Sequence, residues 1–130
     1  MANAVLVDSN YYIGRQRAGS DPFAELAAFD EEWEPVTCGI VMLEVLRGVR
    51  PDGVYHAYRE TFDVMTCVAT TSRIWMAATD LLRTVERRGF TIPAQDAIIA
   101  ASALSIDAPV LTFDKHFTFI PGLTVLTALD

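Results

Sequence analysis

The N-terminal segment 4–7, Ala-Val-Leu-Val, runs directly into the carboxylate of Asp8. Four apolar residues in a row are too few for a helix and are typical of a strand buried on both faces, as in a parallel sheet covered by helices. Ligands of open α/β sheets bind in the crevice beyond the carboxyl ends of the strands. The sequence therefore predicts a parallel sheet with Asp8 at the mouth of a site.

Strand and helix patterns alternate along the rest of the chain. Asp21-Pro22 predicts a helix start, because Asp caps helices well and Pro is tolerated at the first helical position, and we expect this helix to end at Glu34-Pro35. The alternation predicts a three-layer α/β/α sandwich with a mainly parallel central sheet. The other predicted helices cover 10–17, 40–47, the segment from Pro51 to the next strand, the segment from Thr71 or Ser72 to Gly89, and 95–105, and the other strands cover 36–38, 64–68, 110–113 and 123–126.

Length and composition limit the class of protein. The 130 residues predict one domain, residues 1–130, with a single core, and no apolar run approaches the roughly 20 residues of a membrane span. The N-terminus lacks the features of a secretion signal, so we expect a cytoplasmic protein with no membrane partner. Cys38 and Cys67 belong to no CxxC pattern and predict two buried thiols, not a disulfide or a zinc site.

The net charge of −7 argues against a protein that holds nucleic acid mainly through a basic surface. It does not exclude a nuclease, because carboxylates that converge on bound cations present less negative charge to a phosphate than their formal count suggests. An acidic chain also suits a basic protein partner.

Four carboxylates stand at positions that favour one shared site, although each has an ordinary interpretation too. Asp8 and Asp114 end predicted strands, where Asp often forms turns, and Asp96 in a first helical turn can simply complement the helix dipole. Glu44 lies inside a predicted helix whose neighbouring positions are mostly apolar, so we expect it to be half-buried.

Buried carboxylates need a counter-charge, and 10 Lys and Arg residues face 17 Asp and Glu residues in this chain. A divalent cation offsets the repulsion between converging carboxylates. Ligation by oxygen alone suits Mg²⁺ or Mn²⁺ and not zinc.

The same residues resemble the PIN domain family, and within it the VapC-like toxin ribonucleases. The resemblance depends on four motifs, which occur in the family's order and span nearly the whole chain. They are Asp8-Ser9-Asn10 after the first strand, Glu44 in an early helix, Asp96-Ala97-Ile98-Ile99-Ala100-Ala101, and Leu111-Thr112-Phe113-Asp114-Lys115-His116-Phe117.

The resemblance implies a metal-dependent endoribonuclease, the toxin of a toxin–antitoxin module. Its partners would be an RNA substrate, a small cognate antitoxin and a second copy of the chain in a homodimer. Water activated by Mg²⁺ or Mn²⁺ would hydrolyse the phosphodiester and leave 5′-phosphate and 3′-hydroxyl ends. The implied catalytic residues, which would also hold one or two cations, are Asp8, Glu44, Asp96 and Asp114.

Several neighbours of these acids are candidates for supporting roles. Asn10 and Thr112 could orient Asp8 and Asp114 by hydrogen bonds, or could serve only the turns at the strand ends. His116 follows Asp114 closely, but activation of water by a metal needs no histidine, so we assign it no role. The candidates for RNA phosphate contacts, which could equally be solvated surface, are Arg15, Arg17, Arg47 and Lys115.

Two alternatives stay open. One is a binding module that has a PIN-like fold and no turnover. The other is a phosphohydrolase that forms an aspartyl-phosphate on Asp8; its usual second Asp two positions later is Asn10 here, and Lys115 is the chain's only lysine.

Overall fold

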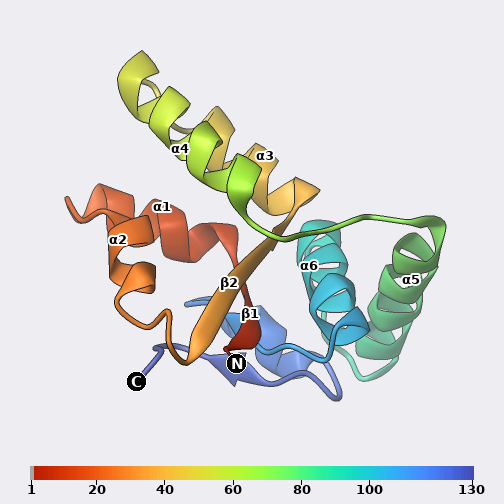
Figure 1. The fold of residues 1–130 in the computed structure, drawn as a ribbon. Helices are drawn as coiled ribbons and strands as arrows, with labels where there is room; N and C mark the ends of the chain where they lie inside the picture. The colour runs from red at the N-terminus through yellow and green to blue at the C-terminus, as the bar shows by residue number, and fades with distance from the viewer. Residues whose placement is uncertain (1) are drawn as a thin grey trace.

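The computed structural model describes residues 2–130. Within them the strands form one five-stranded parallel sheet in the order β3-β2-β1-β4-β5 (Figure 1). The first strand in the sequence therefore lies at the centre of the sheet, with a paired strand on each side of it. The strands are β1 (Asn3–Val7), β2 (Trp33–Cys38), β3 (Cys67–Val68), β4 (Val110–Leu111) and β5 (Val125–Leu126).

Helices cover both faces of this sheet, as the three-layer α/β/α prediction requires. Figure 1 shows α1 and α2 on one side of the sheet, α5 and α6 packed together on the other, and α3 and α4 as a pair beyond its upper end. The helices are α1 (Ser9–Arg17), α2 (Pro22–Ala27), α3 (Gly39–Arg47), α4 (Asp52–Val64), α5 (Ser72–Arg87) and α6 (Ala94–Ser105), with a short 3₁₀ helix η1 (Lys115–Phe119) after β4. No helix within residues 2–130 is both long and apolar enough to cross a membrane.

Burial of β1 and β4 explains why their carboxyl ends meet. Val5, Leu6 and Val7 are fully buried, and Val7 pairs with Leu111 in the parallel register. The N–H of Asp8 donates to the carbonyl of Leu111 at 2.9 Å. Asp8 and the residue that follows Leu111 therefore leave the sheet side by side.

Two helix starts and one helix end confirm their sequence signals. The Asp21 carboxylate accepts hydrogen bonds from the N–H groups of Phe23 and Ala24, and the Thr71 hydroxyl accepts one from the N–H of Ile74. Gly89 follows α5 with φ of +88°, a conformation that favours glycine.

The predicted end of the second helix is wrong. α2 stops at Ala27, and Glu34-Pro35 belongs to β2, which begins at Trp33. Proline is tolerated there because N–H groups on its side of β2 point toward β3, and β3 pairs only with Thr37 and Cys38. The ring of Pro35 thus removes no hydrogen bond of the sheet.

Three further expectations need correction. Val64 ends α4, so the predicted strand 64–68 shrinks to Cys67–Val68. The predicted strands 110–113 and 123–126 likewise form their ladders over only two residues each. Both cysteines are free, but only Cys38 is buried; Cys67 is exposed because β3 is the edge strand.

Candidate active site

Asp8 stands between the end of β1 and the start of α1, and it is only 3% exposed. Its Oδ1 accepts a hydrogen bond from the N–H of Ser9 at 2.8 Å, which caps α1. Its Oδ2 accepts one from the hydroxyl of Thr112 at 2.8 Å. Both oxygens of the buried carboxylate are therefore fixed from two elements.

Thr112 connects Asp8 to Asp114. Its Oγ1 donates to Asp8 and accepts from the N–H of Asp114 at 3.0 Å. Asn10 acts on the backbone instead of on a carboxylate: its Oδ1 accepts from the N–H of Phe113 at 3.2 Å and lies 3.1 Å from Thr112 Oγ1. Together these contacts hold the exit of β4 against the first turn of α1.

Ser9 connects Asp8 to Glu44, a link that the sequence analysis missed. The Ser9 hydroxyl lies 3.1 Å from Glu44 Oε1 and 3.4 Å from Asp8 Oδ1, and its single proton can go to either acceptor. Glu44 is half-buried on α3. The available signal was a hydroxyl directly after the strand-end aspartate.

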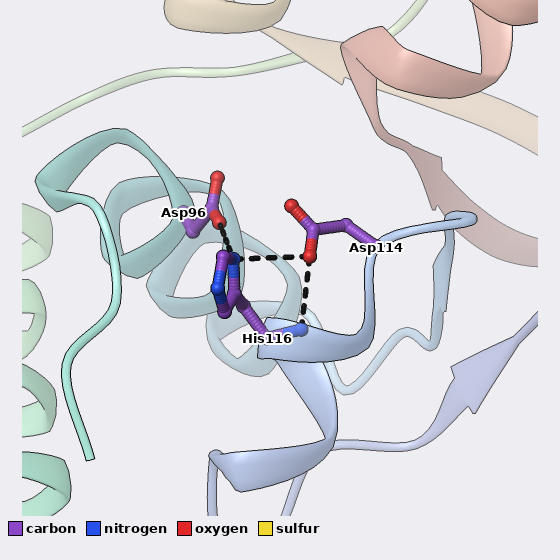
Figure 2. A group of neighbouring side chains, drawn as sticks. All are labelled: Asp96, Asp114 and His116. Atoms are coloured by element: carbon purple, nitrogen blue, oxygen red, sulfur yellow. Dashed lines mark hydrogen bonds and ion pairs between the residues drawn. The ribbon is translucent and has the colours of Figure 1, made fainter.

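Asp96 and Asp114 meet at His116 (Figure 2). Asp114 caps η1 by accepting the N–H of His116 at 2.9 Å, and this turn brings the imidazole back between the two carboxylates. His116 Nδ1 lies 3.0 Å from Asp114 Oδ1 and 3.7 Å from Asp96 Oδ2. His116 was expected to have no role; an Asp-x-His spacing at a strand end was the signal for this contact.

The surroundings of Asp8 favour its protonated form. Burial is the largest influence and raises the pKa of Asp8 from its ordinary 3.8 to about 6. Hydrogen bonds from Thr112 and from the N–H of Ser9 act in the opposite direction. The nearby charges of Glu44 and Asp114 raise the pKa of Asp8 further.

The pKa of Asp96 is raised still further than that of Asp8. Burial, followed by the charges of Asp8 and Asp114, raises the pKa of Asp96 from 3.8 to about 7, and Glu44 adds to the rise. His116 acts in the opposite direction. Because each of the three other acids affects Asp96, the four carboxylates form one electrostatic cluster.

These groups fit a divalent cation. Among residues 2–130, the buried Asp96 Oδ2 accepts no hydrogen bond and the buried His116 Nδ1 has only its ion-pair contacts with Asp114 and Asp96, so both atoms can take part in holding a cation. One ligand atom each of Asp96, Asp114 and His116 lies within 4.8 Å of the others. The charges of Asp8 and Glu44 also act on Asp96, and a cation would offset the burial and the repulsion that raise the pKa values of Asp8 and Asp96.

The four predicted RNA contacts lie in different settings. Arg15 is held by Glu25, with Nε 3.1 Å from Oε2, and its Nη2 donates to Ser20. Arg17 and Arg47 are exposed at the ends of α1 and α3. Lys115 is exposed at the start of η1, next to Asp114. Contact of these side chains with RNA stays a prediction.

Comparison with known proteins points to one family. Ribonuclease VapC4 of Mycobacterium tuberculosis is 25% identical over 127 residues, which cover 94% of this chain and 95% of that protein. Among solved structures, a chain of DNA-bound VapBC from Salmonella typhimurium superposes with a TM-score of 0.78 at 17% identity, covering 96% of this chain and 97% of that one. A chain of a toxin–antitoxin complex from Klebsiella pneumoniae gives 0.73 at 22% identity, covering 95% and 96%.

The match to the family itself includes the whole candidate site. A sequence model of the PIN domain matches residues 5–123, a segment that contains all four acids and the hydroxyls that connect them. The order of the strands, and the position of Asp8 and Asp114 after the carboxyl ends of β1 and β4, agree with this match. The chain belongs to the PIN domain family.

Proposed function

We propose that this protein is an endoribonuclease that depends on Mg²⁺ or Mn²⁺ and acts as the toxin of a toxin–antitoxin module. The observation that carries the proposal is the electrostatic cluster of Asp8, Glu44, Asp96 and Asp114 at the carboxyl ends of β1 and β4. The names of the similar proteins, a ribonuclease and toxin–antitoxin complexes, support the same activity.

In this proposal the four acids hold the cation and the hydroxyls position the acids. A divalent cation at such a site supplies Lewis-acid chemistry, because it activates water and offsets the charge of the phosphodiester. Thr112 keeps Asp8 Oδ2 in one orientation, and Ser9 keeps Glu44 near Asp8. Asn10 fixes the backbone that carries Asp114.

The partners in this proposal follow from charge and from the comparisons. RNA phosphates would be held by the exposed Arg17, Arg47 and Lys115. A net charge of −7 suits a cognate antitoxin with a basic segment, and we expect the protein to act as a homodimer in the cytoplasm.

Cleavage of total cellular RNA by the purified protein tests the proposal. We expect discrete fragments with 5′-phosphate ends in Mg²⁺ or Mn²⁺, and none in chelator. Asp96→Asn is expected to remove cleavage, whereas Asp63→Asn, a matched change at an exposed position on α4, should keep it. Fragments that form equally in chelator, or with the Asp96→Asn protein, would contradict the assignment of the site.

A further inference from the structure

A cavity of about 290 Å³ lies along α1, close to the candidate active site. The aromatic rings of Tyr11, Phe29 and Phe113 line it, together with the charged side chains of Arg15 and Glu25 and the segment 127–130. We call this cavity, with these residues, the base pocket. Of the residues that line it, only Arg15 has a role considered above, as a candidate for an RNA phosphate contact.

Two residues that line the base pocket are neighbours in sequence of residues in the acidic site. Phe113 stands between Thr112 and Asp114, and its N–H donates to Asn10 Oδ1. Tyr11 directly follows Asn10 on α1. With a rise of about 1.5 Å per helical residue, the residues from Tyr11 to Arg15 lie about 4–11 Å along α1 from Asp8. A nucleotide next to a phosphate at the acids can therefore reach the pocket.

Phe113 presents an aromatic surface at the mouth of this pocket. Its ring lies 5.5 Å from that of Tyr11, and a Cβ placed at Gly14 would lie 3.7 Å from two of its atoms, so the ring rests on α1. The residue nevertheless remains 49% exposed. An exposed ring held in a fixed position is a surface on which a nucleobase can stack.

The polar part of the pocket suits the edge of a base. Arg15 and Glu25 form an ion pair, yet their side chains stay 37% and 35% exposed. The guanidinium has five N–H donors, more than its contacts with Glu25 and Ser20 use. Arginine and glutamate side chains are complementary to the acceptors and donors on base edges.

We propose that the base pocket binds one unstacked nucleobase of the RNA substrate, next to the phosphate that is cleaved. Phe113 stacks on the base, and the Arg15–Glu25 pair contacts its edge. The inference rests on the proposed ribonuclease function and adds to it a position at which the enzyme distinguishes bases. A base suits this pocket because the pocket combines aromatic planes with the donor–acceptor pair of Arg15 and Glu25.

Binding and cleavage of single-stranded RNA test the proposal. The first probe is a fluorescein-labelled hexaribonucleotide of random sequence, bound in chelator, where no cleavage is expected, and followed by anisotropy. The second is a random 20-nucleotide library, cleaved in Mn²⁺ with sequencing of the ends. We expect Phe113→Ala and Phe113→Leu to weaken hexanucleotide binding about fivefold or more, to raise KM with kcat nearly unchanged, and to lose base preference at one position beside the cut.

Two control variants separate stacking from general damage. Phe113→Tyr keeps the aromatic face and is expected to keep binding and base preference. Trp75→Ala removes another exposed aromatic, on α5 across the sheet (Figure 1), and should change neither. Wild-type affinity, KM and base preference in Phe113→Ala would overturn the pocket and leave the ribonuclease standing. Failure of the wild-type protein both to cleave the library and to bind the hexanucleotide would overturn both.

Discussion

Replacing Asp96 with asparagine is expected to abolish RNA cleavage and, at the same time, to stabilise the metal-free protein at pH 8. Asp96 is ionised at pH 8 although burial and three neighbouring acids raise its pKa to about 7. At 1.36 kcal/mol per pKa unit, removing this charge is expected to raise the free energy of unfolding by about 2–4 kcal/mol. The midpoint of thermal unfolding should rise by about 10 °C.

RNA cleavage by the Asp96→Asn protein should fall although its stability rises. Loss of groups that only support a metal ligand typically costs 10–100-fold, so loss of a proposed ligand is expected to lower cleavage by more than about 100-fold. Scanning calorimetry in chelator and the RNA cleavage assay measure the two effects on the same protein. Asp63→Asn, at an exposed position on α4, should change neither. A less stable Asp96→Asn protein would show that the negative charge is not what strains the site.

The metal-free protein is expected to be more stable at pH 5 than at pH 8. The pKa values of Asp8 and Asp96 are raised in the folded protein, to about 6 and about 7, above 3.8 for the unfolded chain. The folded state therefore binds more protons between pH 4 and 7, and stability falls as pH rises through this range. From pH 5 to pH 8 the loss is expected to be about 3–4 kcal/mol.

Mn²⁺ should remove the dependence of the protein's stability on pH. A cation that binds only the folded, ionised site stabilises it most at pH 8, where no proton competes. Urea unfolding at pH 5, 6, 7 and 8, with chelator and with Mn²⁺, measures both profiles. A metal-free protein with equal stability at pH 5 and pH 8 would mean that folding does not raise the pKa values of Asp8 and Asp96.

Sequence reasoning reached the sheet and the acids because both depend on local patterns. An apolar run that ends in Asp8, and a second that ends near Asp114, predict strand exits, and parallel pairing brings such exits together. The periodicity around Glu44 indicated its half-buried position. Capping residues such as Asp21 and Thr71 indicated helix starts, because each supplies a side-chain acceptor for the first N–H groups.

The features that the sequence did not predict depend on contacts between distant segments. Pro35 suggested a break in the chain, and only the short length of β3 explains why it fits inside β2. Ser9 contacts Glu44, which lies far from it in sequence. His116 contacts Asp96, which is also distant in sequence, because the capped turn at Asp114 brings its imidazole there. Phe113 falls within the predicted strand 110–113, but it lies after the end of β4, with its ring packed against α1 and partly exposed. The local patterns, a hydroxyl after Asp8 and an Asp-x-His spacing, did not indicate which acids Ser9 and His116 would contact.

The central claim is that the carboxylates of this PIN domain form a divalent-cation site. Calorimetric titration of the metal-free protein with Mn²⁺ at pH 6.5, in two buffers of different ionisation enthalpy, tests it most directly. Carboxyls with pKa values of about 6 and about 7 together carry about one proton at this pH, so saturable binding should release about one proton per site. Absence of saturable binding would contradict the claim and favour a PIN-like binding module without turnover.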